Sequence, residues 1–519
     1  MMAKQNTSRT AFTVMVCTLI SRILGFVRIG VITAVFGAGG KADVINLTFS
    51  IPNNLRKLSA EGALSSAFIP VLSRTIAAEK NGVKSKKIVR NLIGFQLLLL
   101  VPLSVICIIF SEPLIRVVLA EFNEPWQIEL SSGLFRWFIN YLLFISISAV
   151  IIGALNSSGH FLIPAITPIL FSICVISSIL LLHQSIGPYS MAVGVVAGGL
   201  AQILFQLPKF SKYGFDLKPD FSLRNEEFRQ IVRQWLPVLA TSSILTITQT
   251  IAFRFASGLA EGSTSALTYA IVYWQFPYGI FSASISTVLF PKMAKQIAVD
   301  DGEGLLDTIQ YGIRYLAVLL IPSAIFLSMY GHEIISVTLQ RGHFSAENTS
   351  MTARVLTAYS LGLFSTGAYN FLQRYFYSGG NYRTPFIVTS VVAVIDVALS
   401  LWLKETFLGV GGLAIANSAA FTAGLVVLLI LVRRREGRFH GRRILITFCK
   451  IILAMIPFII FLNILRNFTG NWWVSGSSLK NLILLACGFT GSCILILSMY
   501  KFLKIEMLDD ILRRGRKKA

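Results

Sequence analysis

Long, uninterrupted apolar runs are the feature of this sequence that most restricts its fold. Residues 91–110 read NLIGFQLLLLVPLSVICIIF, and residues 481–500 read NLILLACGFTGSCILILSMY. A helix of about twenty apolar residues matches the hydrocarbon thickness of a bilayer. Charged residues make up only 13% of the chain, whereas about a quarter is usual in soluble domains. The sequence therefore predicts an all-α, polytopic membrane protein.

About fourteen membrane-spanning helices are predicted from these runs. The expected spans are 11–36, 43–73, 88–110, 132–155, 161–183, 190–208, 232–258, 265–291, 310–330, 352–376, 384–403, 409–432, 444–466 and 480–502. Lysines and arginines are concentrated in alternate connections and at both ends of the chain. This positive-inside pattern predicts that both termini are cytoplasmic. The net charge of +22 is thus interpreted as a topology signal and an attraction to anionic lipids, not as nucleic-acid binding.

The chain also contains an internal repeat. Three pairs of similar segments align prolines, at Pro102 and Pro322, Pro70 and Pro291, and Pro164 and Pro385. Subtraction gives offsets of 220, 221 and 221, so the spacing is nearly constant. Six spans per repeat give two halves in the same orientation, as in parallel-repeat transporters. The predicted domains are a six-helix lobe (1–212), a second six-helix lobe (213–433) and two extra helices with a basic tail (434–519).

Two arginines lie near the middle of the first predicted span. At 1.5 Å per residue, Arg22 and Arg28 fall within about 6 Å of the membrane centre. A central arginine costs about 2.5–3.5 kcal/mol on insertion scales, so such residues usually face a bundle interior or an aqueous cavity. They lie about 120° apart on an ideal helix, and Gly25 between them is a candidate hinge. The alternative is that either arginine pairs with carbonyls or a carboxylate and locks helices together.

The second predicted span adds more polar groups. Pro52 is expected to interrupt the helix, and Asn53 or Asn54 could cap its restart. Arg56 and Lys57 would then lie at the start of a second half-helix. Such half-helix N-termini bind anionic groups in many transporters. Lys57 and Glu61 are spaced i,i+4 and could instead neutralise each other. Asp43 could pair with an arginine or be a solvated loop residue.

The second half of the chain holds fewer buried charges. Arg254 lies about one turn from the predicted end of its helix, where its side chain could snorkel to the interface. Asp396 lies deeper, which suggests a proton or sodium site, or a counter-ion for an arginine. The six cysteines show no metal spacing and are predicted to be buried small hydrophobes. Because the intramembrane charge is mostly positive and guanidinium groups match phosphate oxygens, the expected substrate is anionic.

Residues 21–73 carry a specific motif set. They contain SRILGFVR, then FGAG, AD, PNNLR and AEGALSSAFIP. This segment resembles the opening of the MurJ (MviN) lipid II flippases, within the multidrug/oligosaccharidyl-lipid/polysaccharide exporter superfamily. The span count, the QFPYGIF stretch at 275–281 and the two C-terminal spans extend the resemblance over the whole chain.

The resemblance implies two six-helix bundles around a central V-shaped cavity, with the last two helices forming a groove for a polyprenyl tail. It implies alternating access that moves lipid II, the undecaprenyl-diphosphate-linked peptidoglycan precursor, from the cytoplasmic to the periplasmic leaflet of the bacterial inner membrane. It also implies a role in peptidoglycan biosynthesis beside the cell-wall synthesis machinery. The family's headgroup-binding arginines match Arg22, Arg28 and Arg56, and its acidic loop residue matches Asp43.

Two positions depart from the family pattern. Ile29 replaces an aspartate that follows the second arginine in many members, and Ile271-Val272 replaces an aspartate–arginine pair. Arg254 is a candidate substitute for the missing cation at Val272. Some members bind sodium, and Asp396 is the candidate here, so coupling to sodium or to the membrane potential is possible; no other cofactor is expected.

Three other functions compete with this one. A flippase for another polyprenyl-linked oligosaccharide, of the O-antigen type, is the nearest alternative. A membrane enzyme acting on polyprenyl phosphates would need clustered acids, and the Asp300-Asp301 and Asp509-Asp510 pairs lack that context. A pseudo-transporter scaffold would have lost the intramembrane arginines. The chain has no G-x-x-x-x-G-K-[ST] nucleotide-binding loop, and no enzymatic activity is predicted.

Overall fold

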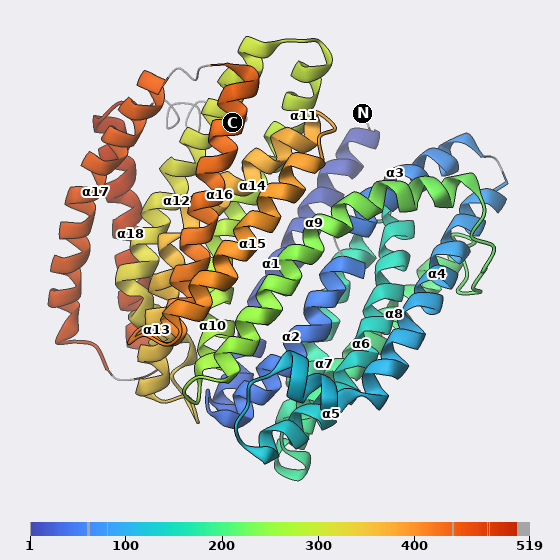
Figure 1. Ribbon diagram of the computed structural model, residues 1–519, viewed down its shortest axis with the longest axis horizontal. Helices are drawn as coiled ribbons and strands as arrows, with labels where there is room; N and C mark the ends of the chain where they lie inside the picture. Colours follow the sequence, from blue (N-terminus) through green and yellow to red (C-terminus); the bar gives the residue numbers. More distant parts are fainter. Residues whose placement is uncertain are drawn as a thin grey trace. The chain divides into compact units, whose positions relative to one another are not determined.

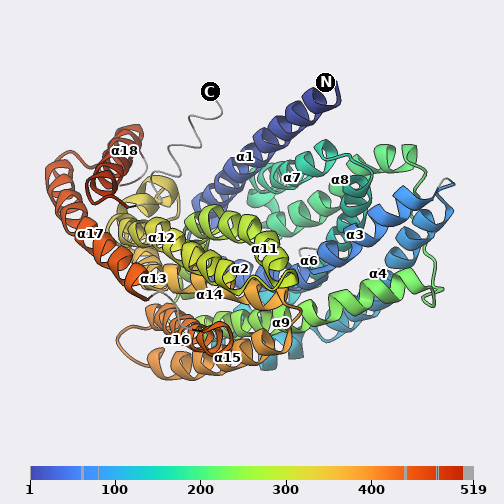
Figure 2. The ribbon, with the colours of Figure 1, turned by 90° about the horizontal axis from the view of Figure 1, so that it is seen from above.

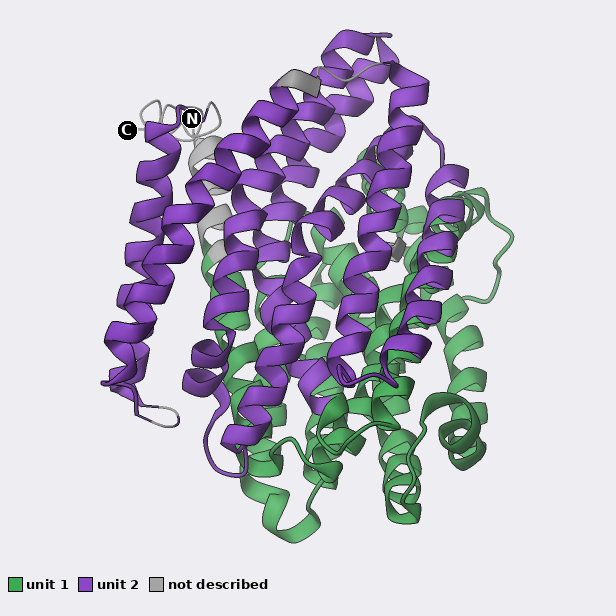
Figure 3. Cartoon of the chain, turned by 60° about the vertical axis from the view of Figure 1, so that its left-hand side comes forward, with its two compact units in different colours: residues 1–264 green, residues 265–519 purple. Residues whose placement is uncertain are grey.

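A computed structural model of the chain describes residues 2–505, with the exception of 60–62, 80, 438–440, 475 and 477. The side chains of these residues are described as well, except those of 2–12, 15, 59, 63–66, 441 and 442. Every regular element in this part of the chain is helical, which confirms the predicted fold class. The chain forms two compact units, residues 1–264 and 265–519 (Figure 3). The domain limits predicted from the repeat stay predictions.

Within its described residues, unit 1 contains nine helices or helical segments, α1 to α9, and one π-helical turn, η1. Figure 1 labels the helices. Their bounds are α1 Met2–Phe36, α2 Gly40–Ser59, α3 Ala63–Ala78, α4 Val83–Ile109, α5 Ser111–Pro113, η1 Leu114–Leu119, α6 Pro125–Ser157, α7 Leu162–Ile186, α8 Tyr189–Lys212 and α9 Glu226–Ser257. Gly37 ends α1 with a φ of 71°, a left-handed conformation that glycine adopts without steric cost.

Unit 2 begins within α10 and continues to the C-terminal helices. The bounds are α10 Ser263–Pro277, η2 Tyr278–Ser282, α11 Ala283–Ala298, α12 Gly302–Leu339, α13 Ala346–Leu361, α14 Leu363–Ser378, α15 Arg383–Leu403, α16 Val410–Glu436, α17 Gly441–Gly470 and α18 Leu479–Phe502. Side-chain caps begin several of these helices. Asp301 accepts from Gly304 N at 2.9 Å, and Ser345 forms a reciprocal capping box with Asn348.

Eleven helices within the described residues are long and apolar enough to cross a membrane. Each remaining predicted span corresponds to consecutive helices: 43–73 covers α2 and α3, 265–291 covers α10 to α11, and 352–376 covers α13 and α14. The chain is therefore a multi-pass membrane protein, and the total of fourteen spans stays a prediction.

The predicted interruption at Pro52 is wrong. Pro52 is buried inside α2, and the helix continues to Ser59. Membrane helices tolerate proline because neighbouring groups can satisfy the freed carbonyl. Arg56 and Lys57 consequently lie in the last turn of α2 and not at the start of a half-helix. The partial charge of the helix end beside them is negative, so a helix N-terminus does not help them to bind an anion.

The core of unit 1 joins helices that are distant in the sequence. Phe68 of α3, Ile93 of α4, Ile151 of α6 and Trp235 of α9 belong to one buried hydrophobic cluster. Helices α7 and α8 pack side by side (Figure 2), and a Cβ at Gly198 would lie only 2.8 Å from the Phe171 ring. Small residues allow this close approach between membrane helices. Helix α9, which opens the second sequence repeat, thus packs with unit 1.

In unit 2, α17 and α18 lie beside each other, and both contact α12 (Figure 2). The Tyr500 hydroxyl donates to the Val318 carbonyl at 2.8 Å, and Arg466 forms an ion pair of 2.8 Å with Glu333. The two C-terminal helices are therefore attached to unit 2 by polar contacts as well as by apolar packing. The prediction that the cysteines are buried is wrong, since all six are half-buried or exposed.

Candidate functional site

Three cations of unit 1 form what we call the cationic cluster: Arg28 on α1 and Arg56 and Lys57 on α2. All three side chains are half-buried. The charges of Arg28 and Arg56 are close enough to interact electrostatically. The structure therefore brings together two of the three predicted arginines, which lie 28 residues apart in the sequence, and Lys57 follows Arg56 directly on α2.

Aromatic residues from neighbouring helices surround Arg28. Its guanidinium carbon lies 5.1 Å from the centroid of the Phe171 ring on α7, a cation–π geometry. The Tyr141 side chain on α6 interacts with it electrostatically. Phe171 and Tyr141 are themselves in contact, with ring centroids 5.2 Å apart. An aromatic face holds the guanidinium without neutralising it, so the charge remains able to bind an anion.

Amide side chains hold the other two cations. Arg56 Nε donates to Asn53 Oδ1 at 3.2 Å, and Lys57 Nζ donates to Asn54 Oδ1 at 3.0 Å. Lys57 Nζ also donates to Gln249 Oε1 of α9 at 3.2 Å. The two asparagines therefore orient the cations and do not cap a helix. Glu61, the other partner considered for Lys57, lies outside the described residues.

Arg22 differs from the cluster, because its side chain is exposed. Leu19, Ile23 and Val27 of the same helix are exposed as well. Among the described residues, Arg22 forms no hydrogen bond or ion pair. Helix α1 runs without interruption through Gly25, where a Cβ would meet nothing within 4 Å. Packing therefore does not explain this glycine, and its role as a hinge stays a prediction.

Asp43 has a structural contact within unit 1. It lies in the first turn of α2, is 3% exposed, and accepts a hydrogen bond of 2.7 Å from the Gly262 backbone. The backbone N–H of Gly40 donates to Glu261 beside it. The alternative of a solvated loop residue is therefore wrong. Asp43 fastens the loop that follows α9 to the beginning of α2.

Arg254 is paired with an acid. Its Nε lies 3.4 Å from Glu121 Oε1, and its Nη1 donates to the Val118 carbonyl at 3.4 Å. The Ser257 hydroxyl, one turn further along α9, accepts from the Glu121 backbone at 2.8 Å. Arg254 thus joins the end of α9 to the segment after η1. Its proposed compensation for the missing cation at Val272 stays a prediction.

Asp396 of α15 is the candidate ion site in unit 2. It is 4% exposed and accepts from Asn417 Nδ2 of α16 at 2.7 Å and from Ser400 at 3.4 Å. Tyr359 of α13 is near enough to interact with its charge. Among the described residues Asp396 has no arginine partner, so the structure does not show it as a counter-ion. The same residues contain no group of three or more histidine, cysteine or acidic side chains that could hold a metal ion.

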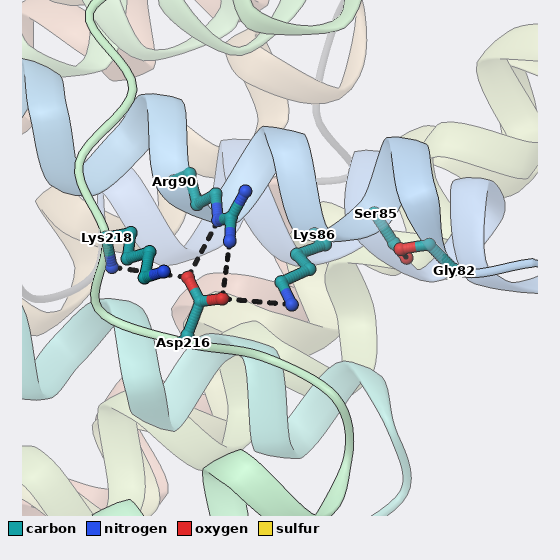
Figure 4. A network of polar contacts seen from close by, with 6 residues as sticks. All are labelled: Gly82, Ser85, Lys86, Arg90, Asp216 and Lys218. Carbon is teal, nitrogen blue, oxygen red and sulfur yellow. Dashed lines mark hydrogen bonds and ion pairs between the residues drawn. The ribbon is translucent and has the colours of Figure 1, made fainter.

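A separate charged network joins the linker between α8 and α9, residues 213–225, to α4 (Figure 4). Asp216 accepts from Arg90 Nε at 2.7 Å and Nη2 at 2.5 Å, and Lys86 Nζ lies 2.9 Å away. The Lys218 backbone donates to it at 3.2 Å. Hydrogen bonds from Arg90 are the main reason that the pKa of Asp216 lies far below its usual range. This network fixes the linker on unit 1.

The fold and the cationic cluster together define a class. Long apolar helices in two units, with half-buried cations inside one of them, are those of a multi-pass membrane transporter. The fold is also that of an inward-facing multidrug resistance MATE family transporter of the MOP superfamily, with a TM-score of 0.66, 16% identity and coverage of 82% of this chain and 98% of that chain.

The comparisons identify the family within this class. The model of the lipid II flippase MurJ family matches residues 32–484. Probable lipid II flippases of Borreliella burgdorferi and Buchnera aphidicola are 34% and 31% identical, covering 96% and 97% of this chain and 97% and 99% of theirs. A solved lipid II flippase MurJ, in an inward closed conformation, has a TM-score of 0.76 and 26% identity and covers 94% of this chain and 99% of that chain. The chain belongs to the MurJ family of lipid II flippases.

Several contacts of the cluster were not predicted from the sequence. Phe171 and Tyr141 give no signal in a span rich in aromatic residues, because an aromatic side chain there is usually core. The repeat does indicate Gln249, because this residue follows Arg28 by 221 positions and therefore takes the same place in the second half. Outside the cluster, Glu121 lies in a segment rich in acidic residues, but no pattern in the sequence indicates Arg254 as its partner.

Proposed function

We propose that this chain moves lipid II from the cytoplasmic to the periplasmic leaflet by alternating access, and that the cationic cluster binds the diphosphate of the headgroup. The observation that supports it is the convergence of Arg28, Arg56 and Lys57 within one unit of a MurJ-family protein. A diphosphate offers several oxygens to guanidinium and ammonium donors. The relatives named above are lipid II flippases, which favours lipid II over other polyprenyl-linked oligosaccharides.

Arg22 has a different place in this proposal. An exposed guanidinium near the middle of an apolar helix is too costly to face lipid tails. Arg22 therefore faces an aqueous path on α1 and meets the headgroup outside the cationic cluster. Asp43 and Arg254 stabilise the structure around the site. Asp43 holds the loop after α9, and Arg254 holds the segment after η1.

The energy source is a further part of the proposal. Asp396, with Asn417 and Ser400 as hydrogen-bond partners, is the candidate for coupling to sodium or to a proton. The positive-inside rule favours a cytoplasmic location for the basic end of α4 and for the linker, and with them for both termini. The transported lipid is consumed by cell-wall synthesis enzymes, which are the expected partners, and the chain itself catalyses no covalent step.

Complementation of a flippase-depleted bacterium tests the function and the site together. Wild type should restore growth, whereas Arg28→Ala and Arg56→Ala should fail although they reach the membrane in normal amounts. Arg116→Ala is the matched control, because Arg116 is an exposed arginine of the same unit that pairs with Glu112 on its own segment. Failure of wild type to rescue would favour a different lipid-linked oligosaccharide. Rescue by both cluster variants would refute the assignment of the site.

A further inference from the structure

Gln249 connects α9 to the cationic cluster. Its Oε1 accepts from Lys57 Nζ at 3.2 Å, and Asn54 Oδ1 accepts from the same nitrogen at 3.0 Å. The two acceptors come from different helices, so the ammonium is fixed between α2 and α9. We propose that Gln249 is a positioning residue, which holds the Lys57 ammonium in place for the anionic headgroup. The inference rests on the proposed function, because it requires Lys57 to bind that headgroup.

The uncharged nature of Gln249 is important for this role. An amide oxygen directs an ammonium group but leaves its charge in place, whereas a carboxylate forms an ion pair that cancels the charge. Unit 1 uses carboxylates where a cation joins two segments, as in Arg254 with Glu121 and Arg90 with Asp216. At Lys57, a neutral acceptor occupies the position on α9. The contact from α9 therefore directs the ammonium group without adding a negative charge beside it.

Helix α9 is held firmly on unit 1, so it can define the position of Lys57. The Trp235 indole N–H donates to the Leu58 carbonyl at 3.3 Å, directly beside Lys57. Before α9, Asp216 and the surrounding linker are bound to α4 (Figure 4). After it, Glu121 binds the last turn. Gln249 is thus carried by a helix fixed at both ends, and its acceptor oxygen has a defined place.

The repeat gives independent support. Gln249 and Arg28 are separated by 221 residues, the offset that also relates Pro70 to Pro291 and Pro164 to Pro385. Each repeat therefore supplies a polar side chain from the same position of its first helix. In the first repeat this side chain is a cation of the cluster, and in the second it is the acceptor that orients another cation.

Two substitutions separate positioning from a structural link. Gln249→Met keeps the size of the side chain but cannot accept the hydrogen bond. Gln249→Glu joins α2 to α9 at least as firmly but pairs with the Lys57 charge. With the full-length protein in nanodiscs and lipid II as the probe, we expect each variant to weaken binding by about tenfold, the value of a hydrogen bond to a charged group. Gln249→Glu should also flatten the decrease in affinity with increasing salt.

The control is Thr250→Val, because within the described part of the chain the Thr250 hydroxyl bonds only to the Thr246 carbonyl on its own helix, at 2.9 Å. This variant should bind lipid II as wild type does, and melting temperatures should show that all variants are folded. If Gln249 does not orient the Lys57 ammonium for the headgroup, Gln249→Met will bind lipid II with wild-type affinity. That result would overturn the inference.

Lys57→Met distinguishes failure of this inference from failure of the proposed function. In the Lys57→Met background, Gln249→Met should cause no further loss, because the two residues act through one contact. Fully additive losses would show that Gln249 acts independently of Lys57, and the inference would be wrong. Wild-type affinity of Lys57→Met alone would instead show that Lys57 does not belong to the headgroup site.

Discussion

Asp216→Asn should loosen the linker from α4 and lower the stability of unit 1. The substitution keeps one acceptor oxygen but removes the charge that binds Arg90 through two nitrogens and Lys86 through a third. The side chains of Asp216 and Arg90 are 29% and 31% exposed, so solvent screens part of the attraction. Exposed ion pairs contribute about 0.2–1 kcal/mol and charged hydrogen bonds about 1.5–3. We expect an intermediate loss of about 1–2 kcal/mol.

Hydrogen exchange measures this loss directly. The Asp220 backbone N–H donates to the Arg90 carbonyl at 3.1 Å, so its protection reports opening of the linker. A loss of about 1.4 kcal/mol corresponds to about tenfold faster exchange. The difference from wild type should shrink at about 1 M salt, where the Debye length is about 3 Å.

The pH dependence follows from the depressed pKa of Asp216. A carboxyl with a lowered pKa in the folded state stabilises the fold above its unfolded pKa of about 4. That stabilisation is lost as the pH falls toward the folded-state value. The difference between wild type and Asp216→Asn should therefore be constant from about pH 6 to pH 8 and decrease only in acid. Glu112→Gln, at an exposed pair in the same unit, is the control. Unchanged exchange in Asp216→Asn would refute the reasoning.

Three further predictions concern single positions. Gly94→Ala should destabilise the fold, because the new Cβ would lie 2.5 Å from a linker carbonyl oxygen. Gly25→Ala should stabilise the fold by up to about 1 kcal/mol, because its Cβ would meet nothing within 4 Å and alanine favours helix. Melting temperatures of the two variants test both expectations. If Arg254 replaces the missing cavity cation, Arg254→Ala will abolish complementation and Glu121→Gln will not. Equal growth of the two variants would show that Arg254 does not have this role. Asp396→Asn should abolish any dependence of transport on sodium or pH, and retention of that dependence would exclude it as the coupling site.

The positions of the apolar helices could be predicted from the sequence, because bilayer thickness sets their length and composition. The continuation of α2 through Pro52 could not be predicted in this way. Proline disfavours helix in water, but α2 is surrounded by other helices that stabilise it, and it continues for another turn and more. The asparagines expected to start a new helix bond to Arg56 and Lys57 instead.

The cluster was predictable in its charges but not in its contacts. Arg28 and Arg56 could be recognised because a guanidinium inside an apolar span has few explanations. The exposure of Arg22 and the packing of Phe171 on Arg28 depend on how α1 lies against α7, which a single sequence does not encode by spacing. The sequence suggests Arg254 as a substitute cavity cation, but it does not show that tertiary packing brings Glu121 to this arginine.

The affinity of the purified protein for lipid II tests the central claim most directly. Wild type, Arg28→Gln, Arg56→Gln and the control Arg116→Gln should be measured side by side at two salt concentrations. The account predicts a loss of about tenfold or more for each of the first two variants, with a weaker dependence on salt, and wild-type affinity for the control. Binding of Arg28→Gln and Arg56→Gln with wild-type affinity would contradict the claim that these guanidinium groups bind the diphosphate.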